Sequence, residues 1–528
     1  MTTTYDAVII GSGHNGLTAG CYLAKAGLNV AIFEERSEPG GGMYTEAFED
    51  HPQFLRNNHA INFLNVRESP VHKDLALERF GAQLIDPVTK VGLPTSDGRA
   101  LMLYSDPLLT KREIARFSEE DAETYEELYY DWMQLAHNIQ RPEWYNPPRS
   151  LEERREIFEG TEKGERYLDI ITRSPVDVIT EHFENEHVQG LLTIMDQAVG
   201  PHPFEQGIDG SLIHAFDGWH NLQIARGGSN QYAQSLVNCF EHYGGDLYLD
   251  SLVDSVTVEN GTATGITLVD GTPIETDIVV SNVHYPQTYL NLVGREHLEE
   301  QFIREIEEKY ELMEGPLFGV HLALDEPLEF SSVKFNPDMQ RAVKFTLGIE
   351  SPDDIKRVSE SAKTNELPDE PVMSAGSVTV LDPSQAPDEK HTAYLWAPSP
   401  WNVEDEGPEY WDEVKDEFME VCIDKLAEYA PNVREDDIIV DKYAYSPLDI
   451  ARTHRNMIQG SRSGGNWGPE QLMDNRPSYS GPIGNLYLSG APTHPGGSIT
   501  CAPGYNCAGV IVDDFGLDKW WRPPEIDV

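Results

Sequence analysis

The chain has 528 residues, and its 39 basic and 90 acidic residues leave a formal net charge of −51. This length exceeds what one hydrophobic core normally supports, and a hydrophobic share of 39% is sufficient for two packed domains. The acidic excess argues against nucleic acid as a partner, because phosphate binding requires clustered Lys and Arg. The acidic residues are spread along the chain, which indicates a solvated coat and not one cation site.

So many uncompensated negative charges repel one another in a compact protein. At about 1 M salt the Debye length falls to about 3 Å, which screens this repulsion. We therefore expect a halophilic protein, with a haloarchaeon-like cytoplasm as its setting. The first residues lead directly into an apolar strand, without the basic region and apolar stretch of a secretion signal, so we expect a cytoplasmic protein.

Residues 5–36 have the pattern of a strand, a glycine turn, a helix and a second strand. Gly11, Gly13 and Gly16 follow an apolar, β-branched run at GxGxxG spacing. Gly11 permits the tight turn, Gly13 lets the backbone approach a pyrophosphate, and Gly16 lets the helix lie close to the strand. The free N–H groups at the start of the helix face the phosphate charge.

The second strand of this unit ends at Glu34, about 20 residues beyond the glycines. A carboxylate at this place can accept hydrogen bonds from both ribose hydroxyls, and it disfavours a 2′-phosphate. The unit therefore predicts dinucleotide binding, with a purely structural turn as the alternative. It leaves the choice between FAD and NAD open.

Two further segments bear on that choice. Residues 37–43 (SEPGGGM) place a second glycine run directly after the acid. Residues 484–509 contain an apolar strand at 486–488, a Gly-Ala turn, the sequence THPGG, and a glycine before an apolar helix. No second GxGxxG follows residue 16, so we find no separate nicotinamide domain.

Together, the opening GSGHNGL, the acid with Arg36 and Gly40-Gly41 after it, and the closing LYLSGAPTHPGG resemble the phytoene desaturase-like FAD oxidoreductases. Within that family, the chain is similar to the pyridine nucleotide-disulfide oxidoreductase domain protein 2 group. The resemblance implies one FAD in an α/β, Rossmann-type domain of the glutathione reductase-like, amine oxidase/phytoene desaturase type, with an interleaved α+β substrate domain. It implies FAD contacts from Gly11, Gly13, Gly16, Glu34, Arg36, Gly40, Gly41, Gly42, Met43, Val253, Gly490, Thr493, Pro495, Gly496, Gly497, Tyr505 and Asn506.

The middle stretch, residues 226–286, alternates helix and strand clearly. In the resembling family this stretch returns to the cofactor domain, and the backbone at the residue that matches Val253 contacts adenine. We therefore expect a discontinuous FAD-binding domain at 1–105, 215–300 and 440–528, and a substrate domain at 106–214 and 301–439. One departure from many relatives of the fold is Ala491, where an acid usually binds the ribityl hydroxyls.

His59 and His494 are the candidates for a substrate-side acid or base, because histidine suits proton transfer near neutral pH. His59 follows the flavin-loop glycines, and His494 lies inside THPGG. A structural role for either histidine is the alternative. Five cysteines without a CxxC pair indicate neither a zinc site nor a disulfide relay, and we expect them to be small core residues.

The preferred function is an FAD-dependent oxidoreductase that adds or removes hydrogen across a C–C bond of an apolar, isoprenoid or carotenoid-like substrate. The alternatives are a redox-neutral flavin-dependent isomerase or hydratase, and a non-catalytic lipid-binding protein like the Rab GDP-dissociation inhibitors. Oxygen or a quinone is the expected electron acceptor. Contact with a membrane face stays open: residues 188–199 could form an entrance or, alternatively, a core helix.

Overall fold

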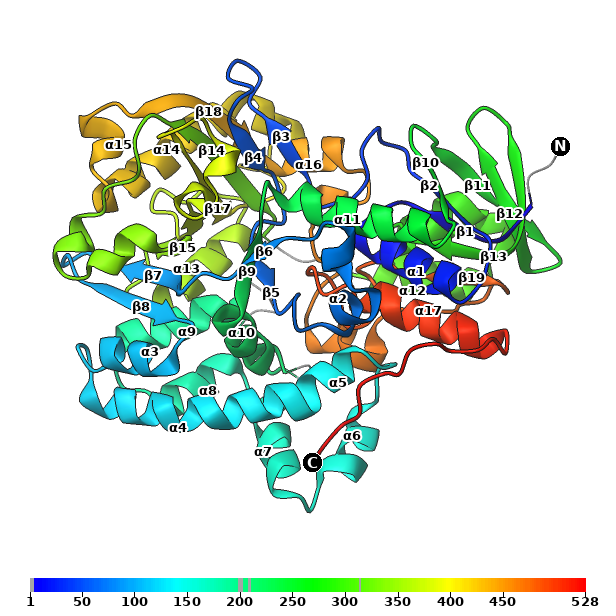
Figure 1. Ribbon diagram of the computed structural model, residues 1–528, viewed down its shortest axis with the longest axis horizontal. Coiled ribbons are helices and arrows are strands. Elements are labelled where there is room, and N and C mark those ends of the chain that lie inside the picture. Colours follow the sequence, from blue (N-terminus) through cyan, green and yellow to red (C-terminus); the bar gives the residue numbers. More distant parts are fainter. Residues whose placement is uncertain (1–3, 198–202, 208–209, 313–314) are drawn as a thin grey trace.

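The computed structural model describes residues 4–197, 203–207, 210–312 and 315–528, which form two seven-stranded sheets with helices around them (Figure 1). The first sheet has the order β10-β2-β1-β13-β12-β11, with β19 paired to β13. Its strands are β1 (Thr4–Ile10), β2 (Val30–Phe33), β10 (Asp246–Tyr248), β11 (Val253–Glu259), β12 (Thr262–Leu268), β13 (Pro273–Ser281) and β19 (Leu486–Leu488). Since β1 and β19 both pair with β13 in parallel, strands from the two ends of the chain belong to one sheet.

Helices cover both faces of this sheet, as the near-continuous apolar sequences of its central strands require. Helices α1 (His14–Lys25), α11 (Ser229–His242) and α17 (Ala502–Asp514) share one hydrophobic core on one face. On the other face, η3 (Gln287–Gly294) and α12 (Glu300–Lys309) pack in a second core. This arrangement confirms the expected Rossmann-type α/β fold.

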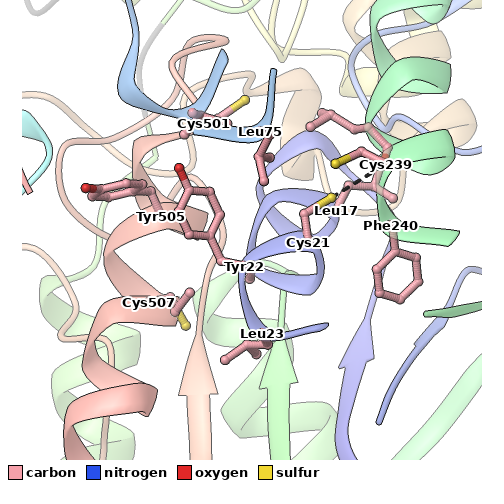
Figure 2. Close-up of a cluster of buried hydrophobic side chains, with 14 of the residues drawn as sticks. Leu17, Cys21, Tyr22, Leu23, Leu75, Cys239, Phe240, Cys501, Tyr505 and Cys507 are labelled. Carbon is pink, nitrogen blue, oxygen red and sulfur yellow. Dashed lines mark hydrogen bonds between the residues drawn. The ribbon is translucent and has the colours of Figure 1, made fainter. Parts of the chain in front are cut away.

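Four of the five cysteines belong to the core between α1, α11 and α17 (Figure 2). Cys21 donates a hydrogen bond to the Leu236 carbonyl at 3.4 Å, and its thiol pKa is raised well above the ordinary value, chiefly by burial. Burial also raises the pKa of Cys501 to about 12. All five thiols are free and buried, which confirms that the cysteines are core residues.

The second sheet has the order β18-β14-β17-β16-β15-β7-β8. Its strands are β7 (Thr89–Pro94), β8 (Ala100–Tyr104), β14 (Leu317–Leu324), β15 (Lys344–Leu347), β16 (Met373–Gly376), β17 (His391–Pro398) and β18 (Ile439–Tyr445). Helix α14 (Trp411–Tyr429) shares a core with one face of this sheet. The other face packs against the segments around Ile61 and Ile224.

The expected cofactor domain included residues up to 105, yet β7 and β8 lie in the second sheet. The reason is pairing: β7 forms a hairpin with β8 and also pairs with β15. We therefore propose a first domain boundary before Thr89. The strand β18 likewise spans the expected boundary at 440.

A helical layer covers the lower part of the second sheet in Figure 1. It comprises α3 (Pro107–Ile114), α4 (Glu119–Leu135), η2 (Ala136–Gln140), α5 (Arg141–Trp144), α6 (Leu151–Phe158), α7 (Glu162–Ile171), α8 (Pro175–His182), α9 (Glu186–Gln197) and α10 (Ser211–His220). In α9, Val188, Leu191 and Leu192 are buried in the core of this layer. Their burial supports the core-helix interpretation of residues 188–199, of which Ala198 and Val199 lie outside the described residues.

The remaining elements lie outside the two seven-stranded sheets. They include β3 (Thr45–Ala47), β4 (Leu55–Asn57), β5 (Phe63–Leu64), α2 (Pro70–Leu75), β6 (Leu84–Ile85), β9 (Leu222–Ala225), α13 (Pro352–Lys363), α15 (Asn432–Glu435) and α16 (Pro447–Thr453). Within the described ranges, no helix combines the length and the apolar character that crossing a bilayer demands. Nor do three or more His, Cys, Asp or Glu side chains of those ranges gather as metal ligands would.

The charge of −51 predicts that salt stabilises this fold. We expect the melting temperature to rise by several degrees as KCl is increased to about 1 M, because the Debye length then falls to about 3 Å and the carboxylates repel one another less. Thermal unfolding followed by circular dichroism measures this shift. Sucrose at matched osmolarity is the control for stabilisation by solutes that are excluded from the protein surface. A melting temperature that does not change with KCl would contradict the prediction.

Candidate functional site

The glycine turn between β1 and α1 leaves no room for side chains. Gly11 has φ +92°, which favours glycine. A Cβ at Gly16 would lie 2.3 Å from the Gly11 carbonyl oxygen, and a Cβ at Gly13 would lie 2.7 Å from Asn282 Nδ2. Asn282 follows β13 directly, and its amide nitrogen lies 3.4 Å from the Gly11 oxygen. The turn is therefore held between the helix that it starts and the neighbouring strand end.

Glu34 links the end of β2 to this turn. Its side chain is 7% exposed, and Oε2 accepts hydrogen bonds from both the backbone N–H and the hydroxyl of Ser12, each at 2.7 Å. Oε1 accepts the backbone N–H of Arg36 at 3.1 Å. A carboxylate offers about four lone-pair sites, so acceptor capacity is left after these three donors.

The chain around Val253 lies beside the acid. The backbone N–H of Ser251 donates to the Glu34 carbonyl oxygen at 2.7 Å, and that of Asp250 donates to the Arg36 carbonyl at 3.1 Å. Val253, at the start of β11, is 5% exposed. The structure thus brings the expected adenine-side residue next to the expected ribose-side acid.

The second glycine run packs against the first. Gly40 N–H donates to the Ser12 carbonyl at 3.0 Å, and a Cβ at Gly41 would lie 3.0 Å from Gly13 Cα. Gly40 and Gly41 have φ +113° and +57°, while Met43 is fully buried. The two runs form one continuous strip of backbone because neither carries side chains at the contact.

The segment after β19 lies beside the same glycine turn. After β19, Ser489 N–H donates to the Ser281 carbonyl at 2.9 Å, and a Cβ at Gly490 would lie 3.4 Å from the Asn282 oxygen. Further along, His14 Nε2 donates to the Ser498 carbonyl at 3.0 Å. Segments from opposite ends of the sequence therefore converge beside the glycine turn.

Helix α17 starts against α1, since a Cβ at Gly504 would lie 2.1 Å from the Asn15 carbonyl oxygen. The ring of Tyr505 packs edge-on against Tyr22, with centroids 5.1 Å apart (Figure 2). Asn506 Nδ2 donates to the Trp144 carbonyl at 2.9 Å. The Asn506 amide is thus bound to the backbone of α5, whereas the buried Tyr505 hydroxyl has no hydrogen-bond partner among the described residues.

The segment THPGG is tightly enclosed. Thr493 Oγ1 donates to the Gly490 carbonyl at 2.9 Å, and His494 and Pro495 are joined by a cis peptide bond. A Cβ at Gly496 would lie 2.8 Å from Trp467, and one at Gly497 would lie 2.9 Å from Ser463 Cα. This segment has no space for larger residues at its two glycines.

His494 is 1% exposed and donates from Nε2 to the Glu143 carbonyl at 3.0 Å. Burial is the main cause that lowers its pKa to about 3. Its imidazole is therefore neutral near pH 7 and already bound to the backbone of another segment. These contacts favour the structural alternative for His494.

His59 belongs to a different cluster, between the second glycine run (residues 40–42) and the second sheet. The next residue, Ala60, donates its N–H to the Gly42 carbonyl at 3.0 Å. His59 Nε2 shares a hydrogen bond with the Tyr445 hydroxyl at 3.2 Å, and its ring centroid lies 4.5 Å from that of His454. Burial, with His454 next in effect, lowers the pKa of His59 well below its usual value.

His454 connects this cluster to the acid-side loop. Arg36 Nη1 donates to His454 Nδ1 at 3.2 Å, and the Arg36 guanidinium lies 4.1 Å from the centroid of the Tyr44 ring. His454 Nδ1 is thus an acceptor, so its proton is on Nε2, which has no hydrogen-bond partner among the described residues. Desolvation, followed by the Arg36 charge, lowers the His454 pKa to about 3.

The second sheet supplies the floor of this cluster. Directly paired residues on neighbouring strands point to the same face. Pairing across β18, β14, β17, β16 and β15 therefore places two rows on one face: Tyr445, Gly319, Trp396, Ser374 and Thr346, and beside it Tyr443, His321, Tyr394, Gly376 and Lys344. We call this set the sheet floor. Its contacts with His59, through Tyr445 and Trp396, show which face it is.

A cavity of about 230 Å³ opens beside the start of α17. Its lining includes Trp144, Tyr145, His214 and Thr500. The ring centroids of Trp144 and His214 lie 3.8 Å apart, and burial lowers the His214 pKa to about 3. This cavity is lined by both aromatic and charged side chains, the latter including Lys73 and Arg141, and it adjoins the segment that leads into α17.

Several residues of the site escaped prediction from the sequence. They are Ser12, His14, Asn282, His321, Trp396, Tyr445 and His454. Asn282 carried a usable signal, because it follows a buried strand that had been assigned to the cofactor domain. The others act through contacts between segments that lie far apart in the sequence.

Comparison with known proteins agrees with this geometry. Residues 9–78 match the family model of the NAD(P)-binding Rossmann-like domain. The chain is 30% identical to a polypeptide of the limonene dehydrogenase of Castellaniella defragrans, covering 98% of this chain and 96% of that protein. It is 25% identical to the lycopene-forming phytoene desaturase of a Paracoccus species, covering 93% and 94%. The chain belongs to the phytoene desaturase-type family of FAD-dependent oxidoreductases.

Other members and neighbours of this oxidoreductase family extend over the whole chain. Pyridine nucleotide-disulfide oxidoreductase domain-containing protein 2 of Mus musculus is 26% identical over 97% of this chain and 94% of its own length. A putrescine oxidase structure has a TM-score of 0.59 at 15% identity, covering 98% of this chain and 99% of that one. An oxidoreductase from Methanosarcina mazei also has a TM-score of 0.59, at 18% identity, covering 96% and 99%. These structures share the fold of this oxidoreductase.

The buried histidines predict how the stability of this oxidoreductase depends on pH. Burial lowers the pKa of His14, His220 and His284 to about 4, and that of His321, His454 and His494 to about 3. Below about pH 6.5 the unfolded state binds protons that the folded state excludes. Stability is therefore fully present above that pH and falls as the pH drops toward the folded-state pKa values.

We expect the free energy of unfolding to fall between about pH 7 and about pH 5, by up to about 1.4 kcal/mol per pH unit for each excluded proton. Denaturant titration at about 1 M KCl measures this slope with the surface charges screened. His321→Gln removes one titrating group and should reduce the slope, whereas the exposed His242→Gln should not. Equal slopes in the wild type and in His321→Gln would contradict the assignment.

Proposed function

We propose that this oxidoreductase binds one FAD along the glycine strip and uses it to add or remove hydrogen across a C–C bond of an apolar substrate. The limonene dehydrogenase and phytoene desaturase among its relatives, as named, support an apolar substrate class. The observation that carries the proposal is the convergence of Gly13, Gly41 and Asn282, where a Cβ on either glycine would lie 3.0 Å or less from a neighbouring atom. Such a bare backbone surface fits a closely approaching pyrophosphate.

The residues of this chain fit the parts of the dinucleotide in order. The N-terminus of α1 directs free N–H groups and its positive end toward a diphosphate. Glu34 keeps acceptor capacity for a ribose hydroxyl, and Val253 lies at the adenine side. The N-terminus of α17 offers the same polarity to the ring's pyrimidine edge, beside Thr493, Gly496 and Gly497.

The bound flavin would supply the hydride acceptor or donor. The residues of this chain would orient the substrate over the sheet floor and exclude water with Trp396, Tyr394 and Tyr445, which are each 6% exposed or less. His59, with its lowered pKa, is a weak base. We propose that His59 Nε2 accepts a proton only from a substrate carbon that has become strongly acidic because the substrate has lost a hydride. Because no second nucleotide turn is evident, oxygen or a quinone is the proposed electron acceptor.

Gly13→Val should abolish flavin binding while the protein still folds, because the new side chain fills the strip and φ at this residue is −59°. The visible spectrum of the purified protein and mass analysis of the released cofactor provide the measurement. Gly509→Ala is the matched control, since it lies in α17 with its nearest neighbour atom 3.8 Å away. A Gly13→Val protein with undiminished flavin absorbance would refute the proposed strip.

Anaerobic mixing with limonene or phytoene should bleach the flavin absorbance without any added reductant, since net hydrogen removal reduces the cofactor. Conversion of the substrate without bleaching would favour a redox-neutral isomerase or hydratase instead. His59→Gln should slow the bleaching by about 100-fold at unchanged flavin content. The exposed His242→Gln serves as its control, and an unchanged rate in His59→Gln would remove this residue from proton transfer.

A further inference from the structure

A buried lysine lies at the inner end of the sheet floor, and Arg462, which is half-buried, lies within electrostatic range of it. Lys344, on β15, is 4% exposed; its ammonium donates to the Ser374 hydroxyl and lies 4.6 Å from the centroid of the Trp219 ring. Burial, followed by the Arg462 charge, lowers the pKa of Lys344 to about 7. Within the described ranges, neither side chain forms an ion pair with a carboxylate.

The positive charge at this place destabilises the fold unless a bound group neutralises it. Burying a charge without a partner disfavours folding, and proteins normally pair such groups. Nearby, the Thr346 hydroxyl is buried and has no hydrogen-bond partner in the described part of the chain. Ser374 accepts from Lys344, so its own hydroxyl proton is free to be donated. These two cations and two hydroxyls therefore have hydrogen-bond donor capacity left for a bound acceptor.

The location connects this group to the proposed reaction site. Lys344 is two strands from Tyr394 along one row of the sheet floor, which is about 10 Å. At the other side, the Arg462 carbonyl oxygen would lie 3.3 Å from a Cβ at Gly497. Lys344 therefore lies on the same face as the His59 cluster, and the backbone of Arg462 lies next to the segment THPGG.

We propose that Lys344 and Arg462 bind the carboxylate of a substrate whose remaining, apolar part lies over Tyr394 and Trp396. The inference rests on the proposed function and deepens it, because among apolar substrates the site would bind more tightly those that carry a carboxylate. The carboxylate would accept hydrogen bonds from the ammonium and the guanidinium. Ser374 and Thr346 would donate to its remaining lone pairs.

Decanoate and decanol are matched probes, because they share the chain length and differ in the head group. Binding to the flavin-loaded protein is measured by calorimetry and by perturbation of the visible spectrum. We expect decanoate to bind at least about tenfold more tightly than decanol, and Lys344→Met to remove that preference with decanol binding unchanged. Lys344→Arg should retain it.

Lys90→Met is the control variant, since Lys90 is also a buried lysine but donates to the Leu222 carbonyl at 2.9 Å. It should leave the decanoate preference intact. Arg462→Met provides a second test if Lys344→Met does not fold. Equal affinities of the wild type for decanoate and decanol would overturn the proposal, as would tighter binding of decyl phosphate than of decanoate.

Flavin content separates this proposal from the one on which it rests. If wild-type protein carries no flavin, the proposed function fails whatever decanoate does. If Lys344→Met alone loses flavin, the lysine serves the cofactor and the carboxylate proposal is refuted.

Discussion

The close approach of backbone to backbone beside Asn282 is the constraint on which the site depends. Three segments meet there: the turn at Gly13, the run at Gly40-Gly41, and the chain after β19. Each contributes a residue without a side chain at the contact, so the surface is shaped by peptide groups and by the side chain of Asn282. Peptide N–H groups and two helix N-termini give that surface a positive polarity inside a protein that is otherwise strongly acidic.

This positive interior contrasts with the exterior. A coat of carboxylates covers the molecule, yet the interior holds neutral histidines and Lys344. The second sheet organises that interior because its alternating side chains place aromatic and polar residues in two rows on one face. Gly319 and Gly376 lie in these rows under Trp396 and Tyr394, since a Cβ on either would come within 2.9 Å of the ring above it. Small residues thus make space for large rings in the sheet floor.

Much of the cofactor side could be predicted from the sequence, because it follows local rules. The apolar run at 486–488 predicted the bounds of β19, and the spacing of Gly11, Gly13 and Gly16 predicted the turn. The contacts that each residue makes with distant segments were harder to predict. Glu34 was expected to face a ribose, but its contacts with Ser12 depend on how tightly the turn closes. The membership of β7 in the second sheet depends on pairing with β15, about 250 residues later, which no local pattern encodes.

The position of β19 has a consequence for how the protein is made. On the ribosome, the first sheet can assemble from β1, β2 and β13 long before residues 489–504 are synthesised. Those residues, which form one wall of the proposed site, follow β13 in the chain by about 200 residues. A nascent chain therefore holds a half-built pocket over that interval, and capture of the proposed prosthetic group has to follow the synthesis of this wall.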